Sequence, residues 1–245
     1  MSRARVAALL TAAALGAAAA PASAADPGTP AEPAGARPTE RGSWIAEPVR
    51  ATTVRSAPAG EVAGRVRPTA PWGGGPAGFM VLGRRADARG RDWLRIRLAT
   101  RPNTAAGWIR ADHARLRATA WRIEIDLGRR EIRLLRQGDV IRRARVVVGA
   151  PGTPTPRGRF AVAEEVAQPP GGFLGTWALH LTAHSEVLED YGGGPGRVAI
   201  HGRDGASFLD PVGTARSHGC IRADNAVVER IVAAVRPGTP VTIHR

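Results

Sequence analysis

Short apolar runs separated by glycine- and proline-rich turns follow one another through most of this chain. Four such runs lie at 53–56, 79–82, 93–98 and 107–110, and a WGGGP loop separates the first from the second. Runs of this length and spacing predict strands, because Gly and Pro interrupt any longer periodicity. We therefore expect residues 43–117 to form a small all-β barrel.

The second half of the chain predicts a longer β pattern. Apolar and polar residues alternate, and turn signals such as Gly128-Arg129-Arg130 separate the runs. His180 and His184 fall on the polar face of one expected strand, and another runs straight into His201. The expected strands are 121–127, 131–135, 140–148, 177–184 and 198–200.

One short helix is predicted near the C-terminal end. Asp224 or Asn225 can cap its start, and Pro237-Gly238 ends it. Its apolar residues share one face, which we expect to pack on the sheet: Val227, Val228, Ile231, Val232 and Val235. The predicted fold class is thus mostly β, with one short C-terminal helix.

The first 42 residues consist of two segments that differ in composition. Residues 1–25 combine Arg3 and Arg5 with an apolar run and a small-residue end, which is the pattern of a secretory signal peptide. The apolar run is too short and too rich in alanine for a membrane span. Residues 26–42 are rich in Pro, Ala and Gly and predict a disordered linker. We expect a secreted or cell-envelope protein with no transmembrane span after signal removal.

The chain is strongly basic, with a formal net charge of +14. Its basic residues are all arginine, and they are spread along the chain instead of forming one patch on a helix. Because no nucleic-acid recognition motif is present either, the charge indicates an anionic envelope surface as partner and no nucleic acid.

Cys220 is the only cysteine, so it cannot form an internal disulfide. It lies between a His-Gly pair and Arg222, near the start of the predicted helix. A thiol attacks as its thiolate, and an imidazolium, backbone N–H groups and a guanidinium would all favour that form. The alternative is a free cysteine packed as a small hydrophobe. Its polar neighbours favour a nucleophile.

Attack on an amide carbonyl also needs a base and donors for the oxyanion. His201 is the better base candidate, because a strand would fix its ring and a backbone carbonyl could orient its second nitrogen. The N–H groups of Gly219 and Cys220 are the expected oxyanion donors. Asp204 and Asp210 stay unassigned.

His201-Gly202, followed after fourteen residues by Ser217-His218-Gly219-Cys220, resembles the signature of the L,D-transpeptidase (YkuD-like) catalytic domain. Further likenesses to that family lie at 147–149, in the Thr-Pro turn 153–160 and in the closing strand 238–243. The resemblance covers about residues 119–245. Segments at 54–58, 93–96 and 107–109 resemble a bacterial SH3-like domain, which implies either binding of wall peptides or a spacer.

The resemblance implies a reaction. Cys220 would attack the amide between a diamino acid and the terminal D-alanine of a peptidoglycan tetrapeptide stem, release D-alanine and leave a thioester. An amine of a second stem would resolve the thioester into a 3→3 cross-link. No metal or organic cofactor is implied, and carbapenem-type β-lactams would acylate the thiol.

The resemblance also implies roles around the thiol. A main-chain carbonyl near Gly202 would orient His201, and His218 would line the site. Ser217 and Arg222 are expected to contact substrate, with an internal ion pair as the alternative for Arg222.

Four other functions stay open. The enzyme could act as an L,D-carboxypeptidase, with water resolving the thioester, or as a generic cysteine peptidase. It could also be a non-catalytic wall-binding protein that keeps the fold. A zinc hydrolase is a further alternative, although the spacing of its candidate ligands matches no zinc motif. Those ligands would be His180, His184, His201 and His218.

Overall fold

The computed structural model describes residues 37–245, and all of these lie in one compact unit. The predicted signal peptide, 1–25, and residues 26–36 of the predicted linker lie outside the described residues. Within the rest of that linker, the Thr39 hydroxyl donates to the Gly42 carbonyl at 3.0 Å and accepts from the Gly42 N–H at 3.1 Å. No helix among residues 37–245 has the length and hydropathy needed to span a bilayer.

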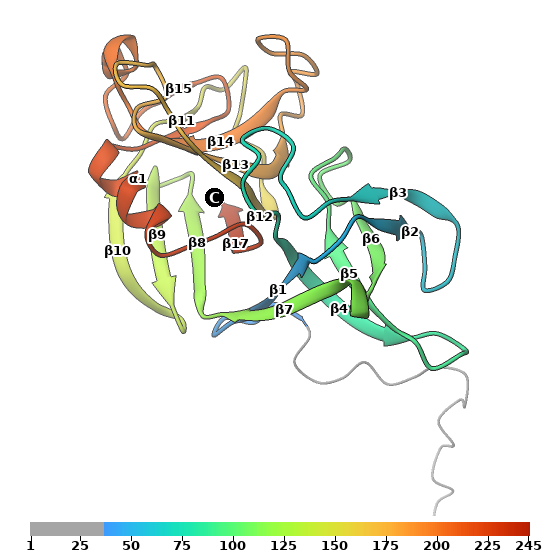
Figure 1. Ribbon diagram of the computed structural model, residues 1–245. Coiled ribbons are helices and arrows are strands. Elements are labelled where there is room, and N and C mark those ends of the chain that lie inside the picture. Colours follow the sequence, from blue (N-terminus) through green and yellow to red (C-terminus); the bar gives the residue numbers. More distant parts are fainter. Residues whose placement is uncertain (1–36) are drawn as a thin grey trace, which may run out of the picture. The chain divides into compact units, whose positions relative to one another are not determined.

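The first sheet is antiparallel, has seven strands, and is coloured blue to green in Figure 1. Its order is β3-β2-β6-β5-β4-β1-β7. The strands are β1 (Ser43–Pro48), β2 (Thr52–Arg55), β3 (Val62–Val66), β4 (Phe79–Ala86), β5 (Asp92–Arg97), β6 (Ala106–Arg110) and β7 (Ala114–Thr119). A 3₁₀ turn, η1 (Ala111–His113), precedes the last of them.

The four strands predicted in this part are confirmed as β2, β4, β5 and β6, whereas β1, β3 and β7 were not predicted. Buried apolar side chains from several of these strands form a common core, including Val54, Leu94, Ile96 and Ile109. The SH3-like nature of this sheet and the boundary at residue 117 stay predictions.

The second sheet has eight strands in the order β10-β9-β8-β17-β12-β13-β14-β16, and β11 pairs with β15 beside it. The strands are β8 (Trp121–Asp126), β9 (Glu131–Arg136), β10 (Asp139–Arg145), β11 (Val148–Gly149), β12 (Gly158–Ala167), β13 (Trp177–His184), β14 (Arg197–His201), β15 (Ala215–Ser217), β16 (Ile221–Arg222) and β17 (Pro240–His244). The strand predicted at 140–148 ends at Arg145, and Val148 belongs to the separate strand β11. The other predicted strands are present, whereas β12, β15 and β16 were not predicted.

One helix, α1 (Asn225–Val232), packs on this sheet next to β13 and β14 (Figure 1). Val228 and Ile231 are its buried residues, which confirms the predicted apolar face. The helix ends at Val232, several residues before the predicted stop at Pro237-Gly238. Asp224 is the N-cap residue but makes no capping hydrogen bond, because its carboxylate pairs with Arg203 at 2.9 Å.

The parallel pairing of β14 with β16 arranges the candidate site. Ile200 lies opposite Ile221, and both side chains are in the hydrophobic core. His201 lies opposite Arg222 in this register, and Cys220 directly precedes β16, where its thiol contacts the backbone of Ala199. Strand pairing thus brings together two residues that are nineteen positions apart in sequence.

Candidate active site

His201 is held in one tautomer. Its Nδ1 lies 2.7 Å from the carbonyl oxygen of Gly202, the contact that the family resemblance implies. A carbonyl only accepts, so Nδ1 carries the proton and Nε2 keeps a lone pair. The side chain is buried, and this burial lowers the pKa of His201 to about 4. The ring is therefore neutral at neutral pH and fit to accept a proton, as the predicted role of base requires.

Cys220 is partly exposed and lies beside the end of β14. Burial of the thiol raises the pKa of Cys220, and the backbone N–H of Ala199 and the charge of Arg222 oppose that rise. The sequence predicted a thiolate favoured by its neighbours, and the structure instead favours the protonated thiol. Helix α1 supplies no N–H groups here, because β16 separates Cys220 from its first turn.

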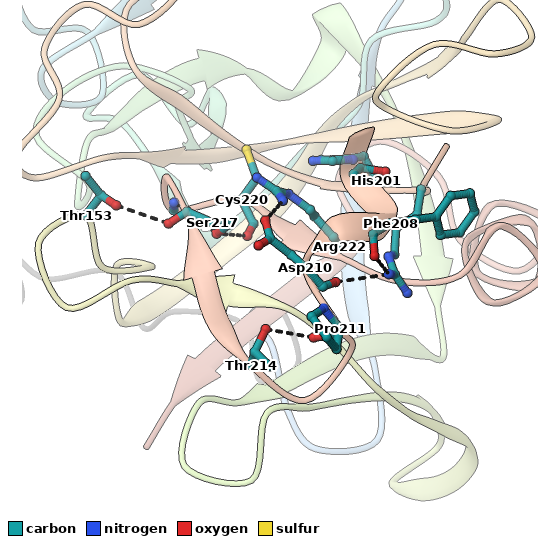
Figure 2. Close-up of polar contacts among 12 residues, drawn as sticks. Thr153, His201, Phe208, Asp210, Pro211, Thr214, Ser217, Cys220 and Arg222 are labelled. Atoms are coloured by element: carbon teal, nitrogen blue, oxygen red, sulfur yellow. Dashed lines mark hydrogen bonds and ion pairs between the residues drawn. The ribbon is translucent and has the colours of Figure 1, made fainter. Parts of the chain in front are cut away.

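Hydrogen bonds inside the turn fix the backbone before Cys220 (Figure 2). The Ser217 hydroxyl donates to the carbonyl of Cys220 at 2.6 Å and accepts from the N–H of Gly219 at 3.1 Å. Gly219 has φ +113, a conformation that side-chain-bearing residues rarely adopt. Ser217 is buried and its hydroxyl closes the turn, and its predicted contact with substrate stays a prediction. The Gly219 N–H is engaged, which leaves that of Cys220 as the candidate oxyanion donor.

The Thr-Pro turn supports the same segment from outside. The Thr153 hydroxyl donates to the carbonyl of Ser217 at 3.1 Å, a contact drawn in Figure 2. Thr155 donates to the carbonyl of Gly219 at 2.8 Å and accepts from the N–H of Gly149 at 2.9 Å. Two segments that resemble the family in sequence are therefore bonded to each other in space.

Arg222 is buried and makes an internal ion pair. Its Nη1 lies 2.6 Å from Oδ2 of Asp210 (Figure 2), and its guanidinium stands 4.8 Å from the ring of Phe173. The side chain of Arg222 is 6% exposed and that of Asp210 is 25% exposed. Of the two roles left open for Arg222, the structure supports the internal ion pair and not a direct substrate contact.

Asn225 ties the base to the start of α1 and was considered only as a cap. Its Oδ1 accepts from the N–H groups of Thr176 at 3.2 Å and Arg203 at 3.0 Å. A Cβ at Gly202 would lie 2.1 Å from that oxygen, so only glycine fits there. Gly202 thus positions His201 through its carbonyl and a close approach, and its N–H donates to Trp177.

His218 is exposed beside the thiol and stacks on Tyr191, with ring centroids 5.2 Å apart and planes 30° from parallel. Tyr191 lies in the loop between β13 and β14. An isolated tyrosine in a glycine-rich segment gave no signal that it contacts the cysteine motif.

Histidine residues do not gather into a metal site. His180 lies on β13 under the indole of Trp72, with centroids 5.7 Å apart, and burial lowers the pKa of His180 to about 4. Among the described residues, no three His, Cys, Asp or Glu side chains are grouped as metal ligands would be. The tautomer of His201 depends on a carbonyl and requires no metal.

A family model described as the L,D-transpeptidase catalytic domain, YkuD, matches residues 120–243, which is about half of the chain. The chain belongs to the L,D-transpeptidase family. This family is one of acyltransferase enzymes, and the match confirms the resemblance found in the second half of the sequence. The SH3-like resemblance of the first half stays a prediction.

Among the proteins similar to this chain is a Bacillus licheniformis protein named as an L,D-transpeptidase, YkuD. It is 34% identical over 124 residues, which are 50% of this chain and 65% of that protein, so the match spans less than two thirds of its length. The catalytic domain of an E. faecium L,D-transpeptidase is 26% identical, with 51% of this chain and 96% of that chain covered and a TM-score of 0.37. The same domain acylated by ertapenem gives 25%, the same coverage and a TM-score of 0.38.

Proposed function

We propose that this protein is a cysteine-dependent L,D-transpeptidase that forms 3→3 cross-links between peptidoglycan stems. The observation that carries the proposal is the neutral His201, with Nδ1 bonded to Gly202 and Nε2 free to accept a proton. Strand pairing brings it close to the segment that carries Cys220, the only cysteine of the chain. Family membership supports acyl transfer as the class of reaction.

In the first step, Sγ of Cys220 attacks the carbonyl carbon of the scissile amide. The thiol proton passes to Nε2 of His201 as the S–C bond forms, because the raised pKa of Cys220 keeps the thiol protonated beforehand. The carbonyl oxygen becomes an oxyanion, which the Cys220 N–H would stabilise by about 3 kcal/mol. The C–N bond then breaks, His201 returns the proton to the leaving amine, and D-alanine departs.

In the second step, an amine of another stem attacks the thioester. His201 accepts a proton from that amine, the C–S bond breaks, and the proton returns to the sulfur. A new amide joins the two stems, and the enzyme is regenerated. If water attacks instead, the product is the shortened stem of an L,D-carboxypeptidase.

The rest of the proposal follows the family resemblance. Peptidoglycan stem peptides are the substrates, and the protein works in the cell envelope after removal of the leader at 1–25. Carbapenem-type β-lactams acylate Cys220, as ertapenem does the E. faecium domain.

Intact mass spectrometry tests this proposal. The full chain is incubated with a carbapenem, or with a tetrapeptide stem and an amine acceptor, beside the variants Cys220→Ala and His201→Gln. We expect one carbapenem adduct and a product that joins the remaining tripeptide to the acceptor amine with wild type, neither with Cys220→Ala, and transfer at least 100-fold slower with His201→Gln. Folded wild type that forms neither adduct nor cross-link would overturn the proposal and favour a wall-binding protein.

A further inference from the structure

A side chain from the first sheet holds a loop of the catalytic region. Arg101 lies between β5 and β6, and its Nη1 donates to the carbonyl of Ser185 at 2.6 Å. Its Nη2 donates to the carbonyls of Leu188 at 3.0 Å and Pro195 at 3.2 Å. One guanidinium thus joins the start and the end of the loop 185–196, which connects β13 with β14. A planar fork of donors suits such a multiple contact, whereas a lysine ammonium fits it poorly.

Asn103, two residues further on, fixes the point where this loop leaves the sheet. Its Nδ2 donates to the carbonyl of His184 at 2.9 Å, and its Oδ1 accepts from the His184 N–H at 2.8 Å. An amide side chain pairs here with the backbone as a neighbouring strand would. Because both the backbone N–H and the carbonyl of His184 are bonded, the end of β13 is held in place.

The loop 185–196 has hydrogen bonds of its own. The Ser185 hydroxyl accepts from the Leu188 N–H at 3.0 Å, and the backbones of Tyr191 and Gly194 bond each other. A Cβ at Gly196 would lie 1.8 Å from the Leu188 carbonyl, so the two ends of the loop meet closely where Arg101 binds. Arg101 therefore adds bonds from outside to those that the loop makes at its base.

The far end of the same loop reaches the catalytic motif. Tyr191 stacks on His218, two residues before Cys220, and both rings are exposed. The loop thus connects the Arg101 contact to the rim of the thiol site.

We propose that Arg101 and Asn103 are positioning residues of the acyl-transfer site. They fix the base of the loop 185–196, and the loop holds Tyr191 against His218 at the rim beside Cys220. This inference rests on the proposed function, because the rim matters only if a peptide stem docks there. Residues 43–119 then contribute to the geometry of the active site, beyond any role as a spacer or wall binder.

Tyr191 is the only tyrosine of the chain, which provides a direct reporter. Protein labelled with 3-fluorotyrosine gives one ¹⁹F resonance, whose shift depends on the stacked His218 ring. We expect Arg101→Ala and Asn103→Ala to move this resonance toward that of free fluorotyrosine. The matched control Arg89→Ala removes the same charge from an exposed turn, where the backbone N–H of Arg89 bonds Asp87, and should leave the resonance in place.

Enzyme kinetics test whether the Arg101 contacts affect the reaction. We expect kcat/KM for stem-peptide transfer to fall about tenfold in Arg101→Ala, because a displaced rim misplaces the stem. Alkylation of Cys220 by the small neutral reagent iodoacetamide should stay within about twofold of wild type, since His201 and the turn 217–220 are untouched. Arg101→Lys should recover part of the loss, because one ammonium can reach some of the three carbonyls.

The outcomes separate this inference from the proposed function. An unchanged ¹⁹F resonance in both Arg101→Ala and Asn103→Ala, or an unchanged kcat/KM with a moved resonance, would overturn the inference. If wild type transfers no stem at all, the proposed function fails, whereas the ¹⁹F shift still reports whether Arg101 places Tyr191. Should Arg101→Ala fail to fold, Asn103→Ala provides the same two readouts.

Discussion

The two segments that border Cys220 are supported in different ways. The turn before the thiol is bonded by Ser217, Thr153 and Thr155, all of which belong to the region that matches the L,D-transpeptidase family. The loop 185–196 on the other side has internal hydrogen bonds too, but Arg101, between β5 and β6, also bonds its base. The turn before Cys220 is therefore supported from within the matched region, whereas the loop at the rim receives an additional contact from outside that region.

The largest expected effect is the loss of unfolding free energy in acid, which arises from the burial of His201. Its pKa is about 4 when folded and about 6.5 when exposed, so only the unfolded state gains a proton as the pH falls through this window. Burial of His201 thus favours the folded protein fully above about pH 6.5, and this advantage is lost progressively toward pH 4.

We expect wild type to lose about 3 kcal/mol more unfolding free energy than His201→Gln between pH 7 and pH 4. Urea titrations at several pH values measure this difference, and His180, which is present in both proteins, cancels. Parallel pH profiles for the two proteins would show that His201 does not titrate as a buried group.

Asp210→Asn should have the next largest effect. It leaves the buried guanidinium of Arg222 without a charged partner, and we expect the unfolding free energy to fall by about 2 kcal/mol. This is less than for a fully buried pair, because a quarter of the Asp210 side chain is exposed. Asp139→Asn on an exposed turn provides a control that should change stability by less than about 0.5 kcal/mol. Equal stability of the two variants would mean that the ion pair does not hold the segment after Cys220.

Ser217→Ala probes the turn itself and should have a smaller effect. The Gly219 N–H loses its acceptor and the Cys220 carbonyl its donor, and we expect a loss of about 1–2 kcal/mol. Thermal unfolding followed by circular dichroism measures this loss, and Ser217→Thr, which keeps the hydroxyl, should recover part of it. An unchanged unfolding free energy in Ser217→Ala would show that the Ser217 hydrogen bonds do not stabilise the turn before Cys220.

The smallest effect on stability is expected on the opposite rim. Tyr191 is 53% exposed, and its contact with His218 is exposed too, so Tyr191→Ala should change the unfolding free energy by less than about 0.5 kcal/mol. Chemical denaturation beside Tyr191→Phe, which keeps the ring, tests this. A loss greater than about 1 kcal/mol would show that the rim is structural, and the contrast between the two sides would no longer hold.

Local patterns in the sequence were enough to predict many of the strands and the helix. The alternation over β8, β9 and β13 and the apolar face of α1 each follow from neighbouring residues. Strand β12 escaped prediction because the proline-rich turn precedes it, and because Glu164 and Glu165 interrupt its apolar residues. The Glu164 carboxylate is buried where it accepts from the Trp72 N–H at 3.1 Å, and such a long-range partner leaves no local sign.

The motif identified the candidate catalytic pair, but not what surrounds it. Spacing pointed to Cys220 and His201, whereas the partners Asp210 and Asn225 are set by contacts between distant segments. The ionisation of Cys220 was mispredicted for the same reason, since neighbours in sequence said nothing of the burial of its thiol. Burial is a property of the packed fold, and it outweighed the positive charge of Arg222.

The pairing of β14 with β16 fixes the register of the two segments that carry His201 and Cys220. His201 lies opposite Arg222 on the adjacent parallel strand, and Cys220 directly precedes that strand, so main-chain hydrogen bonds fix the register between the two segments. Because backbone atoms make this pairing, it does not depend on which side chains lie nearby. A slip of one residue between the strands would instead turn the thiol into the core beside Ile200, and the nucleophile would be lost without any change of residue.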